Sequence, residues 1–185
     1  MASFETSATP VINTPRNPYA LTDLGLLLLR LAVGATMLQA GLVKAFDFGA
    51  TSGSMEAGGW KSSTFAAILV TATEIIGGTL LVVGLLTPLA ACAILAAMID
   101  AWLVNASGSA FWSDPFNVPF LVAFAATSLL FAGAGAYSLD AKFFGRHRWP
   151  GAVTVTLLVL GIAAAVATWI LLNGTNPLHL SDPGA

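Results

Sequence analysis

Five long apolar runs limit what this chain can fold into. Each holds about twenty residues, the length of helix that crosses the hydrocarbon core of a bilayer. The runs occupy residues 21–45, 65–86, 89–107, 118–136 and 152–172. Only 9% of the 185 residues are charged, against roughly 25% in a typical soluble domain. We therefore predict an all-α protein, a polytopic bundle of transmembrane helices.

Composition narrows the possible chemistry. The net charge is −2 and basic residues are scattered, so we expect no nucleic-acid partner. The single cysteine, Cys92, excludes an internal disulfide and a thiolate metal cluster within this chain. His147 and His179 are predicted to lie on opposite faces of the membrane, so we expect no metal site.

The runs divide the chain into four parts. Residues 1–20 are rich in proline and small polar residues and predict a disordered cytoplasmic tail. Residues 21–142 predict a membrane domain of four helices, in which residues 49–63 form a loop rich in glycine and serine. Residues 143–173 add a basic loop and an extra transmembrane helix, and residues 174–185 form a short C-terminal tail.

Basic residues between the runs predict the orientation. With five spans, Arg16, Lys142, Arg146 and Arg148 share one side of the membrane, and Lys44 and Lys61 lie on the other. The positive-inside rule places the N-terminus in the cytoplasm and the C-terminus outside. Lys142, Arg146 and Arg148 set this topology or bind anionic lipid head groups.

Three ionisable residues lie in the middle of apolar runs: Arg30, Glu74 and Asp100. A charge at the centre of a bilayer costs at least about 3 kcal/mol, so such residues usually face the bundle interior and pair. We expect the three to meet near the midplane. As a functional site, Glu74 and Asp100 would be catalytic acids or bases and Arg30 would bind substrate. As a structural feature, they would be an ion-pair network that fixes helix register.

Four further residues are candidates for binding substrate. Gln39 and Lys44 could line a polar entrance, although a lysine near a helix end commonly extends to the membrane surface. Trp102 and Asn105 could contact a lipophilic ring, although an aromatic belt explains Trp102 equally well.

Several segments together show a resemblance to a known family. They are LLRLAVG at residues 28–34, QAGLVK at 39–44, TEIIGG at 73–78, LVVGLLTP at 81–88 and GAGAYSLD at 133–140. In order and spacing, the region 24–142 resembles the DoxX family. The resemblance implies a four-helix membrane unit, here followed by an added fifth span at residues 152–172.

The resemblance also implies a function. Relatives are linked to thiosulfate:quinone oxidoreductase and other membrane oxidoreductase complexes, in prokaryotic plasma membranes. By that analogy the chain is a subunit of a quinone-linked electron-transfer assembly, active as an oxidoreductase only with a partner. Quinone is the implied cofactor, none is held covalently, and residues 152–172 could contact other membrane subunits besides lipid. Two alternatives remain, a non-catalytic assembly subunit and a small-molecule transporter.

Overall fold

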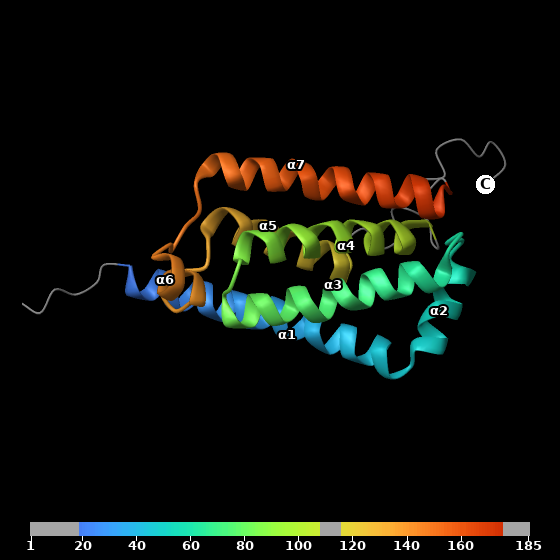
Figure 1. Ribbon diagram of the computed structural model, residues 1–185, viewed down its shortest axis with the longest axis horizontal. Helices are drawn as coiled ribbons and strands as arrows, with labels where there is room; N and C mark the ends of the chain where they lie inside the picture. Colours follow the sequence, from blue (N-terminus) through green and yellow to red (C-terminus); the bar gives the residue numbers. More distant parts are fainter. Residues whose placement is uncertain (1–18, 108–115, 176–185) are drawn as a thin grey trace, which may run out of the picture.

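The computed structural model describes residues 19–107 and 116–175, and all regular structure in these ranges is helical (Figure 1). The long helices are α1 (Ala20–Phe46), α3 (Ser63–Val83), α4 (Thr87–Ser107), α5 (Val118–Ala132) and α7 (Gly151–Thr168). The short helices are α2 (Phe48–Ala57) and α6 (Leu139–Phe144), and a π-helical turn at Trp169–Asn173 follows α7. The predicted all-α bundle is confirmed. Most of both predicted tails, residues 1–18 and 176–185, lies outside the described residues.

Four segments are long and apolar enough to cross a membrane: Ala20–Phe46, Ser63–Val83, Thr87–Ala106 and Gly151–Asn173. α5 is apolar but has only 15 residues. The predicted span 118–136 was too long, because Gly133 takes a positive φ of 86° and ends the helix at Ala132. The chain is a multi-pass membrane protein.

The bundle has two distinct ends (Figure 1). At the hairpin end, residues 84–86 turn α3 into α4, and α6 and the start of α1 lie nearby. At the α2 end, α2 joins α1 to α3 where the loop at residues 49–63 was predicted. Much of that loop is instead helical, because Asp47 Oδ1 caps α2 by accepting from Ala50 N at 3.1 Å. The start of α1 and the end of α7 lie at opposite ends of the bundle (Figure 1).

α1 and α3 pack in close antiparallel contact through glycines. A Cβ on Gly34 would lie 2.8 Å from the carbonyl oxygen of Gly78, and one on Gly41 would lie 2.9 Å from Ile75 N. Small residues let helix backbones approach closely in lipid, where dispersion replaces the hydrophobic effect. These glycines therefore lie on the packing faces of the two helices.

This contact predicts a difference between two glycines of α1. Gly34→Ala should lower the free energy of unfolding by about 1–3 kcal/mol, because its methyl group has no space between the helices. Gly25→Ala, where nothing lies within 4 Å, should be neutral or stabilise the helix by up to about 1 kcal/mol. Thermal denaturation in detergent compares the two. Equal effects would show that the α1–α3 contact is looser than described.

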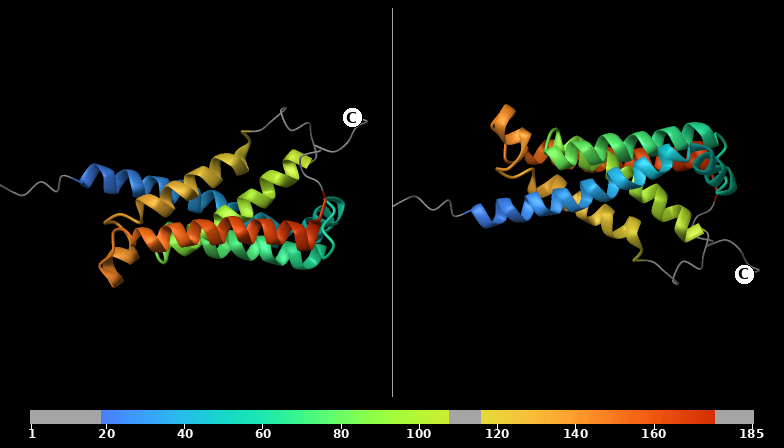
Figure 2. Two further views of the ribbon diagram at one scale, coloured as in Figure 1. Left: turned by 90° about the horizontal axis from the view of Figure 1, so that it is seen from above. Right: turned by 90° about the horizontal axis from the view of Figure 1, so that it is seen from below.

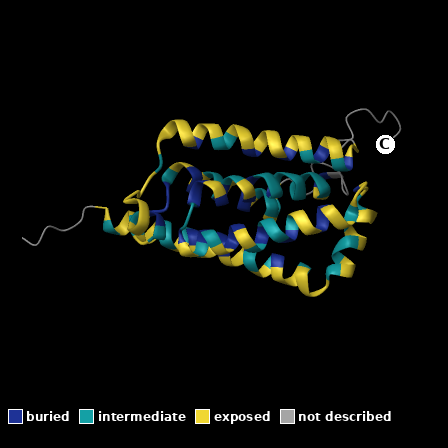
Figure 3. Ribbon diagram, viewed as in Figure 1, coloured by how far each residue is buried: buried dark blue, intermediate teal, exposed yellow. Residues whose placement is uncertain are grey.

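α7 packs on α4 through small residues. A Cβ on Gly161 would lie 3.2 Å from the carbonyl oxygen of Cys92, and Cys92 Sγ donates to Leu157 O at 3.1 Å. Ala165, one turn after Gly161, is also buried. The small pair in the added helix therefore contacts α4 of the same chain. The opposite face of α7 is exposed along its length (Figure 3).

Candidate functional site

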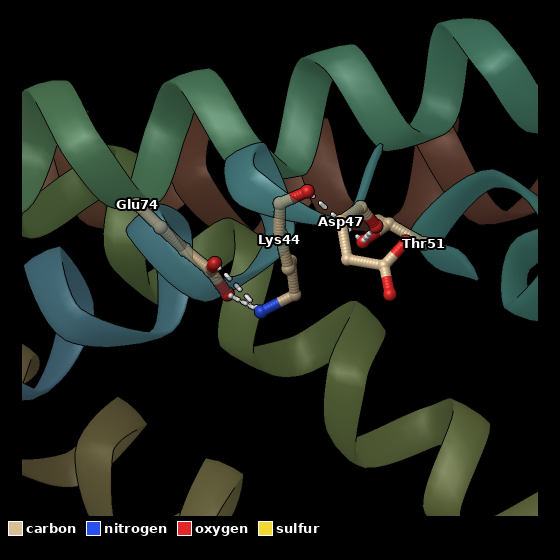
Figure 4. Close-up of polar contacts among 4 residues, drawn as sticks. All are labelled: Lys44, Asp47, Thr51 and Glu74. Carbon is tan, nitrogen blue, oxygen red and sulfur yellow. Dashed lines mark hydrogen bonds and ion pairs between the residues drawn. The ribbon is translucent and has the colours of Figure 1, made fainter. Parts of the chain in front are cut away.

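An ion pair joins α1 to α3 near the α2 end. Lys44, in the last turn of α1, places Nζ 2.7 and 2.9 Å from the two carboxylate oxygens of Glu74 (Figure 4). The Glu74 side chain is 3% exposed, whereas that of Lys44 is 29% exposed. Thr51 Oγ1 donates to the carbonyl oxygens of Lys44 and Asp47 and holds the turn into α2. The pair therefore occupies a fixed position at the edge of the bundle interior.

A pocket of about 420 Å³ opens beside this pair. Its walls come from α1, α2, α3, α4 and α7 and are mostly apolar. Lys44, Glu74 and Asp100 supply the ionisable groups of its lining. Asp100 Oδ1 is buried and has no hydrogen-bond partner within the described part of the chain. An apolar pocket of this size with a few convergent polar groups is typical of a small-molecule site.

Arg30 does not join this group, so the predicted three-residue cluster at the midplane is wrong. The buried guanidinium donates from Nη2 to the carbonyl oxygen of Tyr137. It packs against Gly84, which is ten residues along α3 from Glu74. At 1.5 Å per residue that is a separation of about 15 Å along the helix. Only Glu74 and Asp100 of the three line the pocket.

Arg30 instead belongs to what we call the hairpin lock, formed by Arg30, Gly84, Tyr137 and Asp140. The buried Asp140 carboxylate accepts from Leu86 N at 2.7 Å and Thr87 N at 2.9 Å, which caps the start of α4. Its backbone N–H donates to Gly84 O at 2.8 Å. Asp140 also lies close enough to Arg30 to attract it electrostatically. The lock holds α1, the α3–α4 turn and α6 together.

The other predicted binding residues lie in different places. Asn105 lines the pocket with Lys44. Trp102 lies in a second, apolar pocket of about 340 Å³ between α4, α5 and α7. Gln39 is exposed on α1 and lines neither pocket.

The basic residues near α6 lie at the hairpin end. Lys142, Arg146 and Arg148 are all exposed, with Lys142 5.9 Å from the Phe143 ring centre and Arg146 5.3 Å from that of Trp149. Their role in topology or lipid binding stays a prediction. The described residues contain no group of three or more histidine, cysteine or acidic side chains that could hold a metal ion.

Comparison with known protein families finds a match over part of the chain. The family model for DoxX matches residues 25–107, which span α1 to α4 and contain Arg30, Lys44, Glu74 and Asp100. These residues belong to the DoxX family. Neither a curated protein nor a solved structure matches the chain.

Residues outside the matched DoxX segment line part of its pocket and contact its buried arginine. α7 lies outside it and contributes Ala164 and Thr168 to the pocket. Tyr137 and Asp140 of the hairpin lock also lie outside it, although both serve Arg30 inside it. Later parts of the chain therefore supply the hydrogen-bond acceptor for Arg30 Nη2 and the nearby carboxylate of Asp140.

Three residues that shape the pocket were not predicted from the sequence. Trp60 and Thr73 line it, and Ala164 faces it from α7. A signal was present on α4, where Ala93, Ala96 and Ala97 share a helical face with Asp100. Small residues beside a buried carboxylate leave room for a ligand as readily as for a neighbouring helix.

Proposed function

We propose that this DoxX-family membrane protein binds the head group of a quinone in the Lys44–Glu74–Asp100 pocket, as a subunit of an electron-transfer assembly. The buried Asp100 Oδ1 is the observation that carries the proposal. A buried polar atom without a partner is costly, so a ligand that supplies one gains affinity. The apolar walls suit a lipophilic ring, and the pocket volume lies within the usual range of about 300–1,000 Å³.

The chemistry assigns separate roles to the residues. A bound quinone would supply a reducible ring, which takes up two electrons from a redox partner and two protons, one from Asp100 and one from water. Asp100 is placed to hold a proton at Oδ1 and to donate it within the pocket. Lys44 keeps Glu74 in place and presents Nζ, a donor suited to an oxygen of the head group. The electron donor belongs to another protein, in keeping with a subunit role.

A second candidate, a non-catalytic assembly subunit, is favoured by the exposed outer face of α7. Its apolar side chains include Val155, Val159, Ile162, Val166 and Ile170. In a membrane this face meets either lipid or the helix of another subunit. Mass spectrometry of the protein extracted from its own membrane in mild detergent distinguishes the two candidates. Redox subunits with quinone support the first, and partners without quinone support the second.

For the orientation we propose a cytoplasmic hairpin end in a prokaryotic plasma membrane. Lys142, Arg146 and Arg148 are exposed there, on the same end as residue 19. Labelling of single cysteines introduced at the two ends of the bundle, in a Cys92→Ala background, tests this placement in intact cells.

Quinone binding can be tested by fluorescence, because Trp60 lines the pocket. We expect decylubiquinone to quench the tryptophan emission of the purified full chain with saturation. Asp100→Leu should weaken binding about fivefold, since a hydrogen bond from a neutral carboxyl group contributes about 1 kcal/mol. Asp100→Asn should retain binding but lose proton transfer.

The matched control for this titration is Thr127→Val, which alters the second pocket. It should bind decylubiquinone like the wild type. Unsaturable quenching in the wild type, or equal weakening in Asp100→Leu and Thr127→Val, would contradict a quinone site at Asp100.

A further inference from the structure

The pocket has an alanine-lined side between α3 and α7. Ala93, Ala96, Ala97 and Ala101 line the pocket from the face of α4 that carries Asp100. α3 packs on one flank of this face, where a Cβ on Gly77 would lie 3.1 Å from Ile94. α7 packs on the other flank through Gly161 and Cys92. α3 and α7 each pack on α4 and have little contact with each other, which leaves the alanine face between them.

The arrangement of the helices widens this gap toward the α2 end. Both views in Figure 2 show α4 crossing obliquely, away from α3 and α7, as it approaches that end. The pocket lies in the resulting wedge, with Thr73 and Val70 on the α3 side and Ala164 and Thr168 on the α7 side. Asp100 lies on the α4 side of the wedge.

The α2 end of the wedge is closed by a cap. Trp60 packs edge-on against Trp169, with ring centres 5.8 Å apart. Lys61 N donates to Leu172 O at 2.7 Å, and Asn173 Nδ2 donates to Gly58 O at 2.8 Å. These contacts tie the α2–α3 connection to the end of α7 over the pocket.

The rim between α3 and α7 is open to the membrane. Leu69 on α3 is 41% exposed and also lines the pocket. Ala93 and Ala164, on the other two walls, are likewise exposed pocket-lining residues. The neighbouring outward side chains, Phe65, Ile68 and Leu160, are apolar and exposed. The opening therefore faces hydrocarbon rather than water.

We infer that the pocket is loaded sideways from the bilayer, through the gap between Leu69 and Ala164, and that its ligand carries an apolar chain that lies in this gap. The inference rests on the proposed quinone site and specifies its substrate as a long-chain, membrane-dissolved quinone. The head group reaches Asp100 while the chain passes between α3 and α7 into the lipid. α7, outside the DoxX segment, thereby contributes to ligand selection.

Larger side chains on either side of the gap test this route, in the full chain reconstituted into lipid nanodiscs. Ala164→Phe and Leu69→Trp should each slow the binding of a long-chain ubiquinone about tenfold, measured as the rate of tryptophan quenching after mixing with quinone-loaded vesicles. Their matched controls are Ala163→Phe and Ile76→Trp, at exposed positions on the same two helices that do not line the pocket. The controls should bind at the wild-type rate.

A photoreactive quinone with a diazirine on its first isoprene unit locates the chain directly. Labelling of peptides around Leu69 and Ala164 is the expected result. Wild-type rates in both Ala164→Phe and Leu69→Trp, or labelling confined to α1 and α5, would overturn the lateral route while leaving the quinone site intact. No saturable binding in the wild type would overturn the proposed function and this inference with it.

Discussion

Gly84→Ala should lower the free energy of unfolding by about 4–6 kcal/mol, whereas Gly145→Ala should cost only about 1 kcal/mol. Both glycines end a helix in the left-handed region, with φ of 68° and 63°. The backbone strain of the two substitutions is therefore the same. The space around them is different, because a Cβ on Gly145 meets nothing within 4 Å. A Cβ on Gly84 would overlap Arg30 Nη1 and lie 2.7 Å from Ser138 Cβ.

The extra cost at Gly84 comes from the buried arginine. Accommodating the methyl group requires Arg30 to leave the Tyr137 carbonyl and the vicinity of Asp140. Separating a buried charge from its partners costs about 3–5 kcal/mol, and left-handed strain adds about 1 kcal/mol. That is a large part of a typical stability of about 5–15 kcal/mol.

Membrane abundance and thermal denaturation in detergent measure the difference between the two glycine variants. Gly145→Ala should accumulate normally and melt a few degrees lower. If Gly84→Ala melts at the same temperature as Gly145→Ala, Arg30 can move away without cost and the hairpin lock contributes little to stability.

The sequence predicted the helices well because the bilayer restricts them strongly. A continuous apolar run of about twenty residues can satisfy its backbone in lipid only as a helix or a closed barrel. Small residues such as Gly34 and Gly78 are typical of helix contacts in lipid, and here they leave no room for side chains between α1 and α3. Helix ends were predicted less well, as the early end of α5 and the helical α2 show.

The predicted ionic cluster failed because the helices do not begin at the same depth. A meeting of Arg30 with Glu74 near the midplane requires α1 and α3 to end flush at the hairpin end. α1 has 27 residues and α3 has 21, and α1 extends past the α3–α4 hairpin (Figure 1). Gly34 therefore lies opposite Gly78, and Arg30 lies opposite Gly84 at the end of α3. The relative shift of two helices depends on packing that hydropathy does not record.

The partner of Arg30 could not be found from the sequence for a related reason. Tyr137 lies 107 residues after Arg30 in the sequence. Asp140, also part of the hairpin lock, belongs to the short helix α6, which no apolar run predicts. Lys44 and Glu74 are 30 residues apart and were both recognised, but on different grounds. Pairing them required the register of α1 against α3. The sequence showed which residues can ionise or bind, but it did not show which of them contact one another.

The charges at the pocket should show an asymmetric response to substitution. Lys44→Met leaves the Glu74 carboxylate, only 3% exposed, without its cation, and should destabilise the protein by about 3–5 kcal/mol. Glu74→Gln leaves Lys44, which is 29% exposed and can extend toward water. This second change should cost about 1–3 kcal/mol, the cost of losing the charged hydrogen bonds.

Removing both charges leaves no unpaired charge at the Lys44–Glu74 position. Lys44→Met combined with Glu74→Leu should recover stability to within about 1 kcal/mol of the wild type, because no uncompensated charge remains. Lys142→Met, at an exposed lysine on α6, is the matched control and should change stability by less than about 0.5 kcal/mol. Thermal denaturation of the wild type, Lys44→Met, Glu74→Leu and the double variant in one detergent gives the coupling free energy between Lys44 and Glu74.

The double variant then separates structure from function, because it is folded but lacks both charges. If the pair serves only to hold α1 against α3, decylubiquinone should bind the double variant as it binds the wild type. If Lys44 contacts the head group, binding should weaken about tenfold, the loss of one charge-assisted hydrogen bond. A Lys44→Met protein as stable as Lys142→Met would contradict the first step, since Glu74 would then need no cation.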